Sequence, residues 1–153
     1  MDTRTAITEL IHRSGLIMDE CDFKGYLDLC APDYQYRITA YSPEIRKDMT
    51  WLEHDKAGMK SLFENLHRHN SDKSPISRHI NVCLVDIDEA AEEASVTSTI
   101  EVFRTKLDGG ETELFAVGKL YDTVTLGHQG PALRSRNVRL DTRLLGYGYH
   151  IPF

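Results

Sequence analysis

Apolar residues in the first part of the chain recur at the spacing of α-helices. Steps of three, four and seven residues place one set on a single helical face: Ile7, Leu10, Ile11, Ile17, Met18 and Cys21. Asp2 or Thr3 is suited to cap that helix, and a second short helix over residues 23–30 should end before Pro32. The pattern predicts two N-terminal helices, each with a buried apolar face.

A third helix is predicted from Thr50, because Thr50-Trp51-Leu52-Glu53 has the form of a capping box. Its buried face would hold four apolar side chains, Met59, Leu62, Phe63 and Leu66. The helix should end near Asn70.

Most of the remaining chain alternates with the period of two that is typical of strands. Residues 34–40 form the first such run, and in the second run Ile80, Val82 and Leu84 share one face, opposite His79, Asn81 and Cys83. Three longer runs cover residues 96–107, 112–125 and 133–144, separated by turns at 108–110 and 127–130. Helices followed by long strands predict one α+β domain over residues 1–153, in which a curved antiparallel sheet wraps two or three N-terminal helices as a cone.

Composition and charge narrow the class of protein. The 153 residues are 41% hydrophobic and 27% charged, as in globular proteins, and the formal net charge is −6. A phosphate-binding surface usually has a basic excess, so nucleic-acid binding is not expected. No apolar run approaches the roughly 18–20 residues that span a bilayer, and the first residues do not resemble a signal peptide. Three cysteines without a CxxC spacing are typical of reduced thiols, and we expect a cytoplasmic protein.

Common metal and nucleotide motifs are missing from the sequence. His67 and His69 are two residues apart, so on a helix they would point away from each other rather than at one ion. No HExxH motif, GxGxxG loop, P-loop or GxSxG elbow occurs. We therefore expect no metal and no cofactor in this chain.

His79 is the one candidate for acid–base chemistry. If it faces the inside of the cone, it could meet Tyr34 or Tyr36 across a pocket, and an imidazole with two phenols is suited to proton transfer on a small carbonyl or alcohol. The other interpretation is a histidine that hydrogen-bonds a neighbour and only fixes the packing. The sequence favours the packing role without excluding the catalytic one.

The C-terminal part concentrates arginine and aromatic residues. Four arginines within ten residues of an acidic chain indicate pairing with carboxylates, either in the domain or on a neighbour: Arg134, Arg136, Arg139 and Arg143. The tail over residues 144–153 is apolar and aromatic and has no Asp, Glu, Lys or Arg. Docked into a partner, such a tail would act as an anchor.

Four segments, in this order, resemble the small (beta) subunits of Rieske-type aromatic-ring-hydroxylating oxygenases. They are residues 26–34 (YLDLCAPDY), 77–82 (SRHINV), 118–122 (GKLYD) and 136–141 (RNVRLD). Residues 41–55 are similar to the small subunit of methanesulfonate-type monooxygenases. The resemblance implies the cone of the NTF2-like fold. It also implies a large alpha subunit that carries the Rieske [2Fe-2S] cluster and the mononuclear Fe(II), an alpha3-beta3 hexamer, and a reductase or ferredoxin that acts on the alpha subunit.

We therefore expect a structural, non-catalytic beta subunit of an oxygenase that hydroxylates aromatic rings or oxidises alkanesulfonates. Its contacts with other subunits are predicted to include Trp51, Arg136, Arg139, Asp141, Tyr147, Tyr149 and Phe153. The alternative is a standalone NTF2-like dehydratase or isomerase, in which His79 would be the general base and Tyr34 and Tyr36 would line the site.

Overall fold

A computed structural model describes residues 1–69, 74–142 and 152–153 of the chain. Its helices are α1 (Thr3–Asp19), α2 (Phe23–Asp28) and α3 (Lys56–His69). Its strands are β1 (Cys30–Ser42), β2 (Lys47–Asp55), β3 (Ile76–Asp88), β4 (Glu93–Thr105), β5 (Thr112–Gly127) and β6 (Gly130–Leu140). Helices at the start and long strands afterwards confirm the predicted α+β class.

The first two helices form where the apolar spacing predicts them. The Asp2 carboxylate caps α1 by accepting a hydrogen bond of 2.7 Å from the Thr5 amide, and Asp22 caps α2 by accepting from the Gly25 amide. Four of the six apolar positions predicted to share a face of α1 are buried: Ile7, Leu10, Ile11 and Met18.

The predicted start of the third helix is wrong. Residues 50–53 lie in strand β2, and α3 begins at Lys56, where the Asp55 carboxylate accepts a hydrogen bond from the Gly58 amide. The capping box is a local signal for a helix, but this segment instead pairs as β2 with β1, where Leu52 lies opposite Ile38. The strand pairing outweighs the local helix preference. The predicted buried face of the helix is largely confirmed, since Met59, Phe63 and Leu66 are buried.

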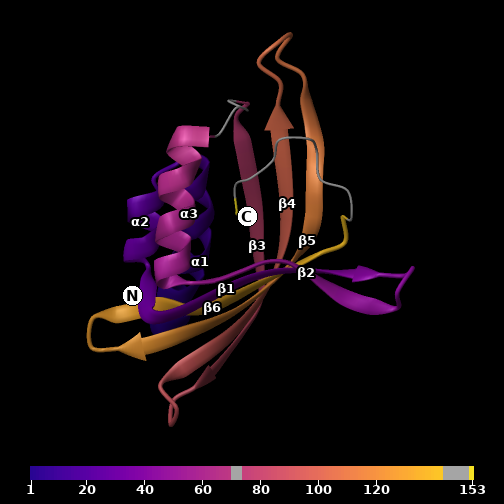
Figure 1. The fold of residues 1–153 in the computed structure, drawn as a ribbon. Helices are drawn as coiled ribbons and strands as arrows, with labels where there is room; N and C mark the ends of the chain where they lie inside the picture. Colours follow the sequence, from indigo (N-terminus) through magenta and orange to yellow (C-terminus); the bar gives the residue numbers. More distant parts are fainter. Residues whose placement is uncertain (70–73, 143–151) are drawn as a thin grey trace.

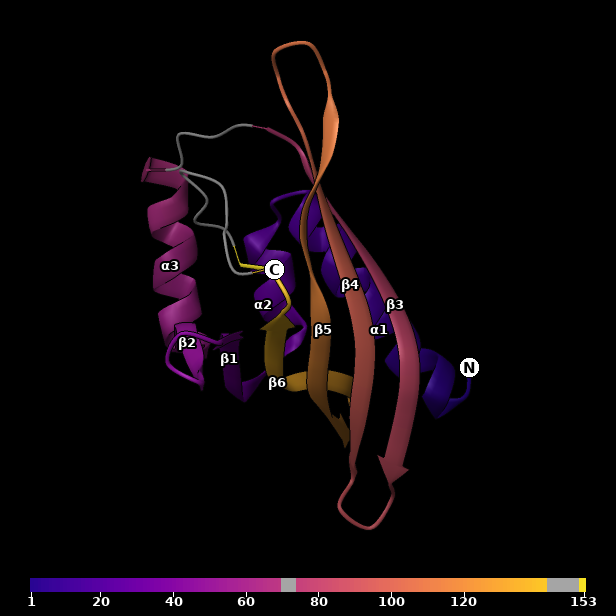
Figure 2. The ribbon, with the colours of Figure 1, turned by 90° about the vertical axis from the view of Figure 1, so that its right-hand side faces the viewer.

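The six strands form one sheet in the order β2-β1-β6-β5-β4-β3 (Figures 1 and 2). The expectation of a wholly antiparallel sheet is wrong in one place, because β1 and β6 run parallel. These two strands are distant in the sequence, so no hairpin forces them to be antiparallel. The other four neighbouring pairs in the sheet are consecutive in the sequence and antiparallel.

The sheet twists strongly, and the helices lie on one side of it (Figures 1 and 2). Helix α1 packs on β3 and α3 packs mainly on β1, so the helices and the concave face of the sheet enclose the hydrophobic core. This arrangement confirms the predicted cone. No helix of the described residues covers the convex face of the sheet.

Bulges in β3 and β6 change which of their side chains point into the cone. Cys83 is an extra residue in β3, because Val82 pairs with Ser98 and Leu84 with the adjacent Thr97. Leu84 is therefore exposed, which contradicts the prediction that it shares a strand face with Ile80 and Val82. An equivalent shift at Arg134 in β6 turns that side chain outward while Arg136 remains inside.

Candidate functional site

A buried ion pair lies inside the cone. The Arg136 guanidinium donates two hydrogen bonds to the Asp122 carboxylate, at 2.7 and 3.1 Å, and a third of 3.0 Å to the Ser14 hydroxyl on α1. The two charged side chains are almost completely buried. Burial raises the pKa of Asp122, and the positive charge of Arg136 opposes that rise. The pair ties β5 and β6 to α1 across the interior.

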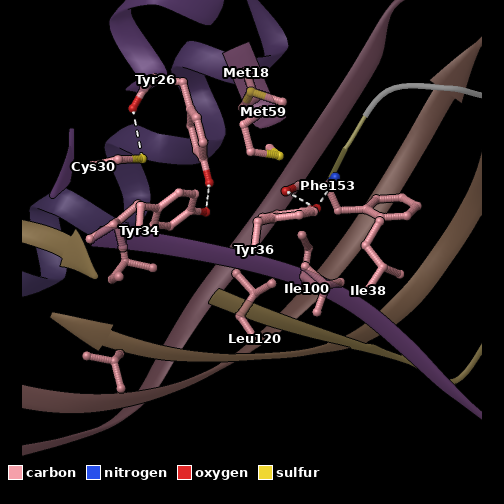
Figure 3. Packing of buried hydrophobic residues seen from close by; sticks show 14 of the residues in the cluster. Met18, Tyr26, Cys30, Tyr34, Tyr36, Ile38, Met59, Ile100, Leu120 and Phe153 are labelled. Atoms are coloured by element: carbon pink, nitrogen blue, oxygen red, sulfur yellow. Dashed lines mark hydrogen bonds between the residues drawn. The ribbon is translucent and has the colours of Figure 1, made fainter. Parts of the chain in front are cut away.

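Two tyrosines from different elements meet in the hydrophobic interior (Figure 3). The hydroxyls of Tyr26 on α2 and Tyr34 on β1 share a hydrogen bond of 2.5 Å, and the side chains are completely buried. Burial raises the pKa of each phenol, so neither is an effective acid near neutral pH. The Cys30 thiol bonds to the Tyr26 carbonyl, and burial raises its pKa to about 12. The hydroxyls of Tyr26 and Tyr34 and the Cys30 thiol therefore bond to one another's residues in the buried interior, where they fix the packing and are not positioned to transfer a proton to a ligand.

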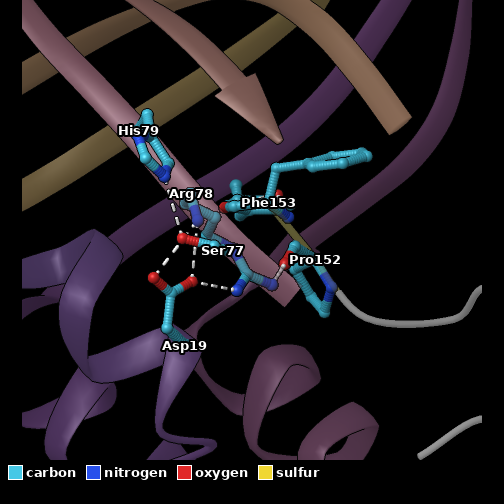
Figure 4. Close-up of polar contacts among 7 residues, drawn as sticks. Asp19, Ser77, Arg78, His79, Pro152 and Phe153 are labelled. Carbon is cyan, nitrogen blue, oxygen red and sulfur yellow. Dashed lines mark hydrogen bonds and ion pairs between the residues drawn. The ribbon is translucent and has the colours of Figure 1, made fainter. Parts of the chain in front are cut away.

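The last two residues of the sequence lie in the interior (Figures 3 and 4). The Phe153 amide donates a hydrogen bond of 2.8 Å to the Tyr36 hydroxyl, and this hydroxyl donates one of 3.1 Å to the Phe153 main-chain oxygen. Arg78 donates a bond of 2.8 Å to the Pro152 carbonyl, and Asp19 accepts from the same guanidinium. The Phe153 side chain is buried.

The geometry that the alternative function requires is absent. His79 lies on the outer face of β3, where its ring contacts Phe103 and its Nε2 is 2.9 Å from the Ser77 hydroxyl. Tyr34 and Tyr36 are completely buried on the inner side of β1. The predicted meeting of His79 with the two phenols across a pocket is therefore wrong, because alternation along β3 places Arg78 and Ile80 inside instead.

The convex face of the sheet exposes apolar and basic side chains together. Leu84 on β3 and Tyr121 on β5 flank Thr97 on β4, and both are largely exposed. Lys119 on β5 lies opposite Arg139 on β6 in the neighbouring row. A mixed apolar and basic surface of this kind is suited to a protein partner.

The predicted subunit contacts fall into three groups. The first group is at least partly accessible to solvent. Trp51, the extra residue of the bulge in β2, is half-buried against the core, and Asp141 is exposed. Arg139 is half-buried and donates a hydrogen bond of 2.7 Å to Asp48. Arg136 and Phe153 lie inside this chain, where their side chains serve its own packing. Tyr147 and Tyr149 lie outside the described residues. The intersubunit role of each of these residues stays a prediction.

Metal ligands do not gather in the described part of the chain. Among residues 1–69, 74–142 and 152–153, no three His, Cys, Asp or Glu side chains lie where they could share an ion. The side chains of His67 and His69, considered above for metal binding, lie outside the description. In the same described ranges no helix is both long and apolar enough to cross a bilayer.

Several residues of the interior were missed by sequence reasoning. No local pattern identifies the partners of Asp19, Arg78 and Asp122, because each partner lies on another helix or strand. The sequence does show charged residues on apolar strand faces, since Arg78 shares a face of its strand with Ile80 and Asp122 shares one with Leu120. Such a position predicts a buried charge with an unknown partner.

Comparison with known proteins places this arrangement in a family. The model of the SnoaL-like domain matches residues 1–131. The sequence is 36% identical to the beta subunit of the methanesulfonate monooxygenase hydroxylase of Methylosulfonomonas methylovora, over 99% of this chain and 87% of that protein. The chain belongs to the SnoaL-like family, among its oxygenase beta subunits.

A second curated relative supports this family assignment, and a solved structure shares the fold. The beta subunit of 2-aminobenzenesulfonate 2,3-dioxygenase from an Alcaligenes species is 31% identical, over 99% of both chains. A crystal structure from Novosphingobium aromaticivorans, assigned as the beta subunit of an aromatic-ring-hydroxylating dioxygenase, superposes with a TM-score of 0.84. It is 21% identical and covers 97% of this chain and 95% of its own, so this likeness shows the shared fold.

Proposed function

We propose that this protein is a structural, non-catalytic beta subunit of a multicomponent Rieske non-haem iron oxygenase. One observation carries the proposal: the sequence matches two curated oxygenase beta subunits, at 36% and 31% identity, over 99% of its length. The cone supports it, because its described interior is packed with paired side chains and with Phe153, and His79 is turned away. The standalone dehydratase has no comparable support.

The proposal assigns the redox groups to a partner. A Rieske [2Fe-2S] cluster and a mononuclear Fe(II) would lie in the alpha subunit, which a reductase or ferredoxin would supply with electrons. Three beta subunits would hold three alpha subunits in register in an alpha3-beta3 hexamer. Electron transfer between alpha subunits falls steeply with distance, so a subunit that fixes their spacing matters without touching the substrate.

We further infer that the assembled enzyme oxidises a sulfonated compound in the cytoplasm. Both curated relatives are named for sulfonate substrates, one an alkanesulfonate and the other an aromatic sulfonate. Oxygen consumption by the purified assembly, with its reductase, should depend on methanesulfonate or on 2-aminobenzenesulfonate. Activity with unsubstituted aromatic hydrocarbons and with neither sulfonate would contradict this inference.

The convex face and its rim are the proposed contact surface. It includes Trp51, Arg139 and Asp141, together with the exposed Leu84 and Tyr121. Leu84 and Tyr121 leave apolar area in contact with water in the isolated chain, and burial against another subunit would remove it. Tyr147 and Tyr149 remain part of the proposal as anchors of the tail.

Co-expression with the genomic neighbours tests the proposal. The chain should purify with a larger, iron-containing subunit, and the mass of the assembly should fit three copies of each. Arg139→Glu reverses the charge of a residue on the proposed contact surface, and the new carboxylate would repel the neighbouring Asp48. We therefore expect this variant to shift the assembly towards separated subunits. Lys24→Glu is the matched control, since Lys24 forms an exposed ion pair with Asp28 on α2, away from the sheet. A chain that purifies alone and turns over a substrate would refute the proposal.

A further inference from the structure

Residues Pro152 and Phe153 occupy the interior in the manner of a bound ligand. Phe153 is 1% exposed and belongs to the same hydrophobic cluster as Ile38 and Ile100 (Figure 3). Its amide and its main-chain oxygen bond to the hydroxyl of Tyr36, 117 residues earlier in the sequence. The dipeptide is thus held by side chains of β1 and β3 rather than by a helix or strand of its own.

Arg78 is shaped for recognition of a carbonyl group. Its side chain is 1% exposed, and Asp19 fixes it from α1 by accepting from Nη1 and from the Arg78 backbone amide (Figure 4). Nη2 donates to the Pro152 carbonyl. Within the described part of the chain, Nε is buried and has no hydrogen-bond partner. Because Asp19 balances its charge, Arg78 presents donors to a ligand that need not be an anion.

We propose that Tyr36, Arg78 and the surrounding apolar side chains form an internal binding site for an aromatic ring joined to an acyl amide, and that Pro152–Phe153 is its resident occupant. The ring fills the apolar space, and the Tyr36 hydroxyl bonds to the amide N–H and to the main-chain oxygen of the ring-bearing residue. The acyl carbonyl of the same amide, which is the Pro152 carbonyl, accepts from Arg78. The site does not depend on the proposed oxygenase function, since every group belongs to this chain.

The first test removes only the ring and uses toluene as the probe. Phe153→Ala leaves an apolar cavity, and apolar cavities of this kind stay dry and bind small aromatic molecules. The Tm of Phe153→Ala should rise as toluene is added, whereas the Tm of the wild type should not. Phe103→Ala is the matched control, because Phe103 lies on the outer side of β4 against His79 and its removal opens no interior space. A folded Phe153→Ala that shows no toluene-dependent rise would overturn the proposal.

The second test restores the dipeptide from solution. In a chain lacking Pro152 and Phe153, N-acetyl-Pro-Phe-amide should bind measurably by calorimetry, and N-acetyl-Pro-Ala-amide should bind far more weakly. Tyr36→Phe in the same background should weaken binding by about tenfold or more, because it removes the hydroxyl that bonds to both the amide and the main-chain oxygen of Phe153. Equal binding of the two peptides to the folded truncated chain would refute specific recognition. If the truncated chain does not fold, the toluene titration decides.

Discussion

Replacement of Arg136 by methionine should destabilise this protein more than any surface substitution. The guanidinium makes two hydrogen bonds to Asp122 and one to Ser14, and both charged side chains are shielded from water. Methionine keeps much of the volume but leaves the Asp122 carboxylate buried without a counter-charge. Removal of one partner from such a pair costs about 3–5 kcal/mol, so we expect that loss in the free energy of unfolding near neutral pH.

The loss should depend on pH. In Arg136→Met the burial that raises the pKa of Asp122 persists, and the charge that opposes this rise is gone. A carboxyl whose folded pKa lies above its unfolded value stabilises the fold in its protonated form, and this stability is lost as the pH rises through the folded pKa. The deficit relative to wild type should therefore be smallest in acid and grow as the pH rises above about 4, the ordinary pKa of an aspartate.

Urea unfolding followed by circular dichroism measures both effects, on protein purified in the same oligomeric state. The double variant Arg136→Met/Asp122→Leu is the control, because it removes both charges and should recover most of the lost stability. It should also lose the pH dependence that Asp122 causes. A loss below about 1 kcal/mol in Arg136→Met, or an equal loss in the double variant, would show that the pair is not the source of stability.

Three further predictions concern the core. Tyr34→Phe should lower the free energy of unfolding by about 1–3 kcal/mol in thermal or urea unfolding, because it leaves the buried Tyr26 hydroxyl without its partner. At pH 8 iodoacetamide should modify the exposed Cys21 and Cys83 well before Cys30, whose raised pKa and burial protect it; mass spectrometry of modified peptides would show the order. Gly118→Ala should cost about 1–3 kcal/mol or more, since its Cβ would lie 2.3 Å from the Arg139 carbonyl oxygen; unchanged stability would contradict this close approach.

Short-range sequence patterns correctly predicted the features that form within a single segment of the chain. The helical face of residues 7–18 and the turn at residues 108–110 follow from side-chain period and from glycine, and the structure has both. The predicted start of α3 and the predicted face of Leu84 were wrong for a different reason. A capping box gives way to non-local strand pairing, and one bulge residue reverses the face of each residue beyond it. No local pattern in this sequence marks the extra residue.

The interior was harder to predict than the fold because its polar groups are joined across the chain. Arg78 meets Asp19 and Pro152, and Tyr36 meets Phe153, at separations of 59 to 117 residues. Sequence reasoning placed Tyr36 beside His79 only in the alternative function, whereas in the structure the Tyr36 hydroxyl bonds to Phe153. Only the order of the strands in the sheet brings these groups together, and no single segment encodes that order.

The cluster of arginines in β6 illustrates how one strand serves two surfaces. The sequence predicted that these arginines pair with carboxylates in the domain or on a neighbour, and those that the structure describes pair within the domain. Arg136 points inward to Asp122, whereas Arg139, three residues later, points outward to Asp48. Because Asp48 is half-exposed, the outer pair contributes little to stability. A partner that offers Arg139 a better-buried carboxylate could replace Asp48 at small cost, so substitutions at Arg139 should affect assembly, whereas substitutions at Arg136 should affect folding.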